Sequence, residues 1–235
     1  MSRVEGKGTS GVLRAPASLA DQVYDAIVDE ICDGRLAPGT HLVQEGLAAR
    51  FGTSRQPIQQ AMARLKADAM VEEAGRRGLF VMPIDPGRMR NHYGVRAALD
   101  GRAARTAARR VAGGEGPGPS LERRGRAVLE AGRAAIDAGD VAGQVRRDVA
   151  FHALVYEASG NPLLAVAAEP HWRYLRRAMG DVLRRVERPE AIWGQHEAIL
   201  EAVLGGDATA AERLATEHVE AAAERLSAVL EGGGR

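Results

Sequence analysis

The sequence predicts a mainly α-helical protein in two parts, a winged helix-turn-helix (three helices plus a β-hairpin wing) followed by an all-α bundle of six or seven helices. Hydrophobic residues make up 45% of the 235-residue chain but aromatic residues only 4%, and the alanine-rich remainder favours helices over sheets. Clusters of glycine and proline divide the chain into segments whose apolar residues recur at helical spacing.

The first predicted domain covers residues 18–83 and follows a flexible arm at residues 1–17. Apolar residues at steps of three and four predict three helices, with Ser18 and Ser54 as the N-caps of the first and third. Two short extended runs around a Gly-bounded turn then predict the hairpin. These elements are expected at about residues 19–33, 43–51, 54–69 and 70–82.

The second predicted domain covers residues 84–231, and residues 83–87 at its start have the character of a linker, with two prolines and a glycine. Every later segment has a helical pattern, and the short connections between the segments predict a bundle. The helices are expected at about residues 87–112, 120–138, 141–159, 162–186, 189–204 and 207–230.

Charge and composition exclude several classes of protein. The 32 Lys and Arg residues against 31 Asp and Glu give a net charge of +1, so any nucleic-acid surface must be a local patch. Cys32 is the single cysteine, which excludes an intrachain disulfide and a thiolate metal cluster. The first fifteen residues lack the apolar core of a signal peptide and no segment is long and apolar enough to span a membrane, so we expect a cytoplasmic protein.

The third predicted helix has the chemistry of a DNA-recognition helix. Between Ser54 and Lys66 it carries basic residues and no acidic one, and Arg55 lies in the first turn, where arginine can pair bidentately with guanine. An isolated basic helix is more often a solvated face. The combination of helix, turn, basic helix and basic hairpin tip favours DNA binding. The candidate DNA contacts are Ser54, Arg55, Gln56, Gln59, Gln60, Arg64, Arg76 and Arg77.

Four residues of the second domain form a candidate metal site. Asp148 and His152 are four residues apart on one predicted helix, and His196 and His218 lie near the inner faces of two later helices. Three imidazoles and one carboxylate suit a divalent transition metal such as Zn²⁺ or Ni²⁺. Each residue alone is more often an ordinary polar residue, and spacing across three helices does not fix their geometry.

Two stretches of the first domain resemble the GntR family of regulators. Residues 31–42, ICDGRLAPGTHL, are similar to its I-x-x-G-x-L-x-P-G-x-x-L signature, and residues 47–58, LAARFGTSRQPI, to its L-A-x-x-x-G-V-S-R-x-P-V. Gly78 and Val81 match the family's wing. The resemblance implies DNA binding by a homodimer to a palindromic operator, with Arg55 as a base or phosphate contact.

The chain departs from that family at Gln59 and Gln60, where the family usually has Arg-Glu. The loss of that arginine removes a DNA contact, so the departure concerns sequence preference rather than fold.

The second domain resembles the FCD domain of the FadR subfamily. Arg96 to Asp100 resembles its opening R-x-x-L-E, and Asp148 to His152, followed by Ser159 to Pro162, is similar to its D-x-x-F-H and S-G-N-P run. His196 to Leu200 and His218 fall where the family has its remaining two histidines.

This second resemblance implies that Asp148, His152, His196 and His218 bind the metal inside the bundle, and that the carboxylate of a small organic acid fills open coordination sites. Arg96 is the candidate charge partner of that acid, because a cavity that receives an anion needs a permanent cation. The alternative for Arg96 is a surface pair with Asp100.

Two other functions compete with that of an effector-responsive regulator. A metallohydrolase would also use such a metal site, but the sequence has no H-E-x-x-H motif and catalysis leaves the first domain unexplained. The sequence does not distinguish a metal sensor, in which the metal is itself the signal, from a regulator that binds an organic effector beside a metal. In either regulator, ligand binding would shift the placement of the two DNA-binding domains in a dimer, and repression and activation both remain open.

Overall fold

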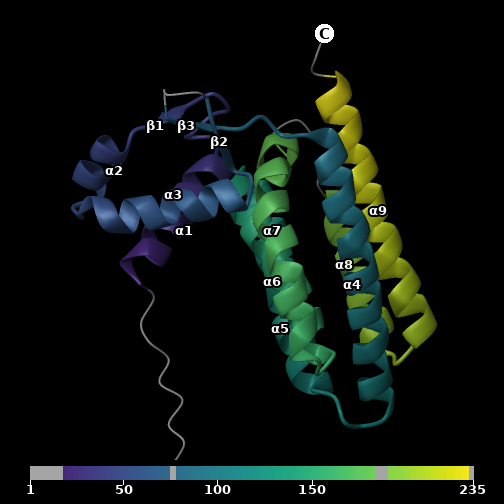
Figure 1. Ribbon diagram of the computed structural model, residues 1–235. Helices are drawn as coiled ribbons and strands as arrows, with labels where there is room; N and C mark the ends of the chain where they lie inside the picture. Colours follow the sequence, from purple (N-terminus) through teal and green to yellow (C-terminus); the bar gives the residue numbers. More distant parts are fainter. Residues whose placement is uncertain (1–17, 75–77, 184–189, 233–235) are drawn as a thin grey trace, which may run out of the picture.

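The computed structural model describes residues 18–74, 78–183 and 190–232. The expected flexible arm at residues 1–17 and the expected wing-tip contacts Arg76 and Arg77 lie outside the described residues. In the described part, a small helical domain with a three-stranded sheet lies against one end and one side of a long helical bundle (Figure 1).

The first domain has the predicted winged helix-turn-helix order. Ser18 caps the first helix as expected, because its hydroxyl accepts a hydrogen bond from the Asp21 backbone N–H while the Asp21 carboxylate accepts from the Ser18 N–H. Ser54 occupies the N-cap position of the third helix but its hydroxyl makes no capping bond. The elements are α1 (Leu19–Cys32), β1 (His41–Leu42), α2 (Gln44–Phe51), α3 (Arg55–Ala67), β2 (Val71–Glu73) and β3 (Leu79–Val81).

The sheet contains one strand more than expected. The strands β2 and β3 form the predicted hairpin, and β1 pairs antiparallel with the other edge of β3, which gives the order β1-β3-β2. Its register places His41 opposite Phe80 and Leu42 opposite Leu79. Since β1 is only two residues long, it has no alternation of apolar and polar residues that a sequence pattern could reveal.

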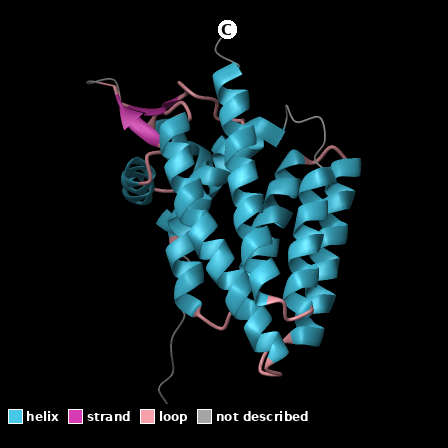
Figure 2. Cartoon of the chain, turned by 90° about the vertical axis from the view of Figure 1, so that its right-hand side faces the viewer, coloured by secondary structure: helices cyan, strands magenta, loops and turns pink. Residues whose placement is uncertain are grey.

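The described part of the second domain is a bundle of six helices, as predicted (Figure 2). The linker is shorter than expected, because α4 already begins at Pro86 with the Asp85 carboxylate accepting from the Arg88 N–H. Proline is favoured in the first turn of a helix, where its missing N–H has no partner to lose. The helices are α4 (Pro86–Ala112), α5 (Gly118–Asp137), α6 (Val141–Ala158), α7 (Pro162–Leu183), α8 (Glu190–Leu204) and α9 (Ala208–Gly232).

Two glycines let α5 approach α8 closely. A Cβ atom at Gly125 would lie 2.8 Å from Leu200, and one at Gly132 would overlap the indole ring of Trp193. Both partners are fully buried in the bundle core. Because His196 lies one turn after Trp193, this packing also fixes the height and rotation of a helix that carries a candidate metal ligand.

The two domains meet where α1 and the end of α3 lie against α7 (Figure 1). Arg176 of α7 forms an ion pair with Asp29 of α1, and Arg173 of α7 lies 3.6 Å from Asp68 at the end of α3. Tyr24 donates a hydrogen bond to the same Asp68 carboxylate. One helix of the bundle therefore holds the DNA-binding fold by charged contacts.

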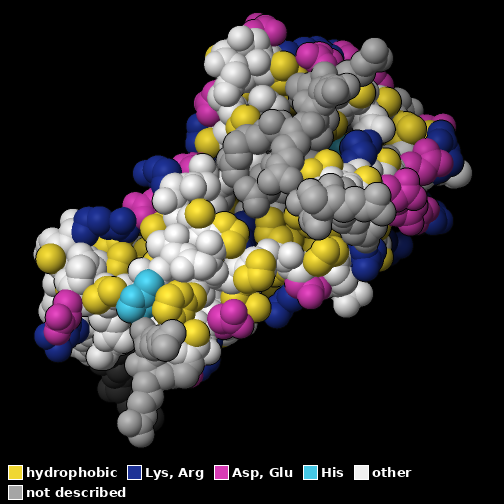
Figure 3. Space-filling view, turned by 90° about the horizontal axis from the view of Figure 1, so that it is seen from above, with side chains coloured by type: hydrophobic (Ala, Val, Ile, Leu, Met, Phe, Trp, Pro, Cys, Tyr) yellow, Lys and Arg dark blue, Asp and Glu magenta, His cyan; other side chains and the backbone are white. Residues whose placement is uncertain are grey.

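Acidic and basic side chains are interspersed over the face seen from above, so no region of one charge stands out there (Figure 3). This distribution agrees with the net charge of +1. Within the described residues, we find no helix that combines the length and the apolar character needed to cross a membrane.

Candidate metal centre and DNA-binding surface

The four predicted metal ligands come together inside the bundle. Asp148 and His152 lie one turn apart on α6, and His196 and His218 reach the same point from α8 and α9. One donor atom from each lies within 4.8 Å of all the others, and all four side chains are buried. Helix periodicity thus places the first two ligands on one face, and the bundle supplies the other two from facing helices.

The spacing of the donor atoms suits a transition-metal ion. Two nitrogen or oxygen ligands that lie about 2.1 Å from one ion, at angles of 90–110°, are about 3.0–3.4 Å apart. The distance from His196 Nε2 to Asp148 Oδ1 is 3.2 Å, and that from His196 Nε2 to His218 Nε2 is 3.1 Å. His152 Nε2 is farther out, at 4.0 Å from Asp148 Oδ1.

Acceptor oxygens behind the ligands favour one tautomer of two imidazoles. His152 Nδ1 lies 3.3 Å from Asp100 Oδ2, and His218 Nδ1 lies 2.9 Å from Gln195 Oε1. Each oxygen can hold a proton on Nδ1, which turns the Nε2 lone pair toward the centre of the site. Partners of this kind orient the ligands of metal sites and raise their basicity.

Two buried polar atoms of the site are left over. Among the described residues, Asp148 Oδ2 and His196 Nδ1 have no hydrogen-bond partner. Buried polar atoms are rarely unpaired, so each such atom requires an explanation. A metal ion would account for the free Asp148 oxygen, whereas His196 Nδ1 points away from the Nε2 side of its ring and would need a water. A carboxylate with a free oxygen and three converging imidazoles together fit a divalent transition metal.

Electrostatics favour the metal-binding protonation states of His218, His196 and Asp148. Burial, with the charges of His196 and His152, holds the pKa of His218 well below its usual value, and burial also lowers the pKa of His196 although Asp148 opposes it. Burial alone would raise the pKa of Asp148, but the hydrogen bond from His196 and the nearby positive charges outweigh it and lower that pKa. Neutral imidazoles beside an ionised carboxylate are the forms that coordinate metal.

Arg96 lies beside the site rather than on the surface. Only 1% of it is exposed; its Nε donates to Asp100 Oδ2 at 3.0 Å, and its guanidinium lies 3.6 Å from the centre of the Trp172 ring. Its Nη2 is 2.8 Å from His152 Nε2. The surface location that we considered as the alternative is therefore wrong, whereas the expected pairing with Asp100 is present.

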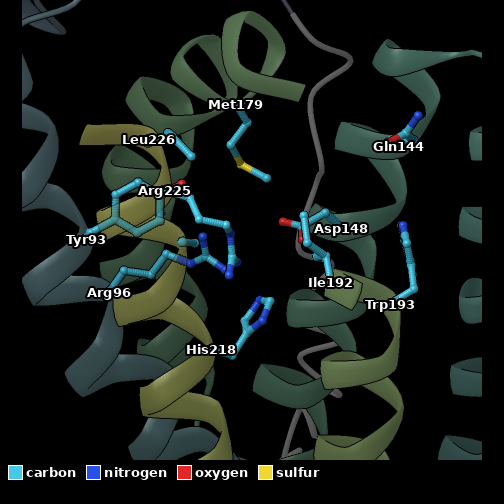
Figure 4. Close-up of a pocket in the computed structure, with 11 residues that line it drawn as sticks. Tyr93, Arg96, Gln144, Asp148, Met179, Ile192, Trp193, His218, Arg225 and Leu226 are labelled. Carbon is cyan, nitrogen blue, oxygen red and sulfur yellow. The ribbon is translucent and has the colours of Figure 1, made fainter. Parts of the chain in front are cut away.

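A small cavity opens beside two of the four ligands, Asp148 and His218. It offers a volume of about 40 Å³ to the centres of water-sized molecules, enough for a small ligand but not for a large one. Figure 4 shows Tyr93, Arg96 and Arg225 on one side of it and Asp148 on the other. Met179 and Leu226 supply part of its apolar lining.

Sequence reasoning missed several residues of this region. Asp100 was noted only as a partner of Arg96, and its bond to His152 depends on the packing of α4 against α6. Gln195 had no signal beyond its position next to His196. Arg225 did have a signal in the sequence, because it follows His218 by seven residues and so lies on the same face of α9.

The start of α3 presents most of the predicted DNA contacts together. The exposed residues there are Ser54, Arg55, Gln56, Gln59 and Gln60. The Arg55 guanidinium lies 2.5 Å from Glu45 of α2, in a pair whose side chains are about two-thirds exposed. Such an exposed pair contributes little free energy, so Arg55 can exchange Glu45 for DNA.

Arg64 is placed differently from the other predicted contacts. Its guanidinium pairs with Asp21 of α1 and lies 4.2 Å from the centre of the Tyr24 ring. In this position it links α1 to α3 rather than extending from the open end of α3.

Comparisons with known proteins agree on both halves of the chain. Residues 19–81 match the model of bacterial regulatory proteins of the gntR family, and residues 92–221 match the FCD domain. The chain is 27% identical over 205 residues to the HTH-type transcriptional repressor RspR of Escherichia coli (strain K12), and the match covers 87% of each chain.

Further likeness comes from a second relative and from a solved structure. The chain is 28% identical over 207 residues to the protein named "Probable D-xylose utilization operon transcriptional repressor" of Paenarthrobacter nicotinovorans, again over 87% of each chain. The structure of Escherichia coli McbR/YncC is similar with a TM-score of 0.75 at 20% identity, over 90% of this chain and 98% of that one. At that identity the structure supports the fold alone.

Proposed function

The chain belongs to the GntR family of bacterial regulatory proteins with an FCD domain, and we propose that a small organic acid, bound beside a divalent transition metal in its bundle, changes its affinity for DNA. Its family and relatives are helix-turn-helix transcription regulators, so DNA-binding regulation is its activity and we propose no catalytic one. We place the boundary between the DNA-binding and effector domains near residue 83.

The observation that carries this proposal is the convergence of Asp148, His152, His196 and His218 on one buried point. Acceptors at Asp100 and Gln195 favour the ligating tautomer of two imidazoles, and Asp148 keeps an unpaired carboxylate oxygen. Zn²⁺ suits this donor set, and Ni²⁺ is the alternative. When bound, the metal would supply a positive charge that attracts carboxylate oxygens.

Arg96 is the proposed second partner of the acid. It lines the cavity, and its charge is permanent because guanidinium does not deprotonate in proteins. In the structure it donates to the His152 Nε2 atom that we assign to the metal. Metal and Arg96 therefore compete for one lone pair, and occupation of the metal site would free the Nη2 group of Arg96 for the acid.

The proposed signal passes through α7. Trp172 of this helix packs on Arg96, and Arg173 and Arg176 form ion pairs with Asp68 and Asp29 of the DNA-binding domain. A ligand that moves Arg96 would thus alter the helix that contacts the DNA-binding fold. In a homodimer, this shift would change the fit of two recognition helices to a palindromic operator.

The proposed DNA contacts are the residues at the start of α3. Arg55 would pair with a guanine or a phosphate, Ser54 with a phosphate, and Gln56, Gln59 and Gln60 with base edges. The wing residues Arg76 and Arg77 remain proposed contacts.

Metal analysis tests the first half of the proposal. The variants His152→Ala and His196→Ala should each lose most of the bound metal, because each removes one of four ligands. His171→Ala, which removes a half-buried histidine of α7 away from the site, is the matched control and should retain it. Full occupancy in both site variants would refute the assignment of these ligands.

Selection of bound DNA from a random pool tests the second half. Arg55→Ala should weaken binding to the selected site about 10- to 100-fold, the loss expected for one bidentate base contact. Arg102→Ala, an exposed arginine of α4, is the control and should bind normally. Undiminished sequence-specific binding by Arg55→Ala would refute the recognition-helix assignment.

Calorimetric titration of the metal-loaded protein with carboxylic acids separates the two regulators considered above. Binding of an acid that also changes DNA affinity supports an organic effector. Absence of binding across a broad panel, together with metal-dependent DNA affinity, would instead identify the metal as the signal.

A further inference from the structure

We propose that the effector carries two acidic groups, the first bound at the metal and Arg96 and the second bound by Arg225. This inference rests on the proposed function, because it specifies the ligand of the same cavity. Arg225 lies beyond residues 92–221, the range that matches the FCD domain.

Helix geometry aims Arg225 at the cavity. It follows His218 by seven residues, which is two turns and about 10 Å along α9. Helical side chains lean toward the N-terminus of their helix, so the long arginine side chain reaches back toward the level of His218. Figure 4 shows its guanidinium beside that of Arg96, facing the side of the cavity from which Asp148 projects.

The guanidinium of Arg225 has unused hydrogen-bonding capacity. Its Nη2 atom is buried and makes no hydrogen bond to any described residue. The contrast with Arg96 is direct, since Arg96 is neutralised by Asp100 at 3.0 Å. A buried cationic donor without a partner is unfavourable. The position of the Arg225 Nη2 group beside a cavity therefore points to an anion in the cavity that accepts its hydrogen bond.

A second unpaired donor lies in the same wall. The Tyr93 hydroxyl of α4 is buried and also has no hydrogen-bond partner among the described residues. Burial raises the pKa of Tyr93, so the hydroxyl keeps its proton and can donate to an anionic oxygen. Arg225 and Tyr93 together therefore offer a hydrogen-bonding site for a carboxylate apart from the metal ligands.

The charges of the loaded cavity favour a dianion. A divalent ion exceeds the single negative charge of Asp148 by one, the pair of Arg96 and Asp100 is neutral, and Arg225 adds another positive charge. A monocarboxylate would leave one of these charges unbalanced beside the apolar Met179 and Leu226. The cavity offers about 40 Å³ to the centres of water-sized molecules and so requires a compact ligand with a short chain between its acidic groups.

The test compares dicarboxylates with their own monoamides, which keep the size and shape but lose one charge. Metal-loaded protein is titrated calorimetrically with malonate, succinate and glutarate, and with the monoamide of each. We expect at least one dicarboxylate to bind about tenfold or more tightly than its monoamide, the difference made by one charge-assisted contact. In Arg225→Met this preference should fall to about twofold or less, because the affinity for the dicarboxylate falls more than the affinity for its monoamide.

Controls keep the outcome interpretable. Arg213→Met removes an arginine of the same helix that pairs with Glu217 on the surface, and it should keep the full preference. Arg225→Lys should keep part of the preference because it retains the charge, and Tyr93→Phe should reduce it by a smaller factor. Melting curves and metal content show that each variant is folded and loaded.

The possible failures are distinguishable. Equal affinity for every dicarboxylate and its monoamide, or a preference that survives in Arg225→Met, overturns the role of Arg225 but leaves a carboxylate-responsive regulator. Absence of binding by all six compounds, and by simple monocarboxylates, overturns the proposed function and this inference together.

Discussion

The buried pair of Arg96 and Asp100 gives the most demanding prediction. Asp100→Asn keeps the shape of the side chain but removes the charge that neutralises Arg96, and both side chains of the pair are only 2% exposed. Breaking a buried ion pair by removing one partner lowers the free energy of unfolding by about 3–5 kcal/mol, because the remaining charge is left uncompensated. For a chain of this length, that loss corresponds to a fall in melting temperature of about 10 °C.

The assay is urea unfolding of the metal-free protein at pH 7, followed by circular dichroism. The matched control is Glu217→Gln, which removes the acid of another Arg-to-acid pair at the same four-residue spacing, but one whose side chains are more than half exposed. This change should lower the free energy of unfolding by less than about 1 kcal/mol. Equal effects of Asp100→Asn and Glu217→Gln would refute the reasoning from burial.

A double-mutant cycle then separates the pair from its surroundings. In an Arg96→Met background, Asp100→Asn should be milder by about 1–3 kcal/mol, because no buried cation remains to be neutralised. Asp100→Asn should also weaken metal binding about 10- to 100-fold, since the Nδ1 proton of His152 loses its anionic acceptor. Strict additivity of the two changes would show that the charges do not interact.

Three further predictions concern other parts of the chain. Gly132→Ala forces a Cβ atom into the Trp193 ring, whereas the Cβ atom of the control Gly194→Ala meets nothing within 4 Å and gains about 1 kcal/mol of helix propensity. Gly132→Ala should therefore have a free energy of unfolding about 1–3 kcal/mol lower than Gly194→Ala. Equal melting temperatures of the two variants would contradict this. Burial lowers the pKa of His92 to about 4, so the unfolded chain binds a proton at a higher pH than the folded one, and stability should be lost as pH falls from about 6.5 to 4. At pH 5 the loss should be about 1 kcal/mol after allowing for the partial exposure of His92, and His92→Gln should flatten the pH profile of urea unfolding. Burial raises the pKa of Cys32 to about 12, so thiol reagents should label it only at the rate of unfolding, and rapid labelling of the folded protein would show that the thiol is accessible.

The sequence predicted the helices well because each is defined by local periodicity and by its own punctuation. The Ser18 cap could be predicted for the same reason, since its partner Asp21 is three residues away. The two-residue strand β1 could not, because it exists only through pairing with β3. Its stabilising contacts come from a segment that lies almost 40 residues later in the chain.

The candidate site shows the same division. The four converging ligands follow from helix spacing together with the family resemblance. The position of Arg64 could not be predicted from helix spacing, because its partner Asp21 lies 43 residues away in the sequence. Either DNA or Asp21 can accept the hydrogen bonds of the same guanidinium. Arg225 was missed because an arginine near the end of a helix is most often solvated. Only the structure of the cavity wall shows that part of the Arg225 side chain is buried.

The charged contact between α7 and the DNA-binding domain limits how strongly the effector can act. Coupling between two sites cannot exceed the free energy that distinguishes the arrangements of the element joining them. The pairs of Arg173 with Asp68 and of Arg176 with Asp29 are partly exposed, and such pairs contribute about 0–1 kcal/mol each. If these pairs supply most of the difference, one subunit would change operator affinity by about 30-fold at most, and added salt would reduce that factor. This protein would then grade transcription against effector concentration, and a steep response would require both subunits of a dimer to act together.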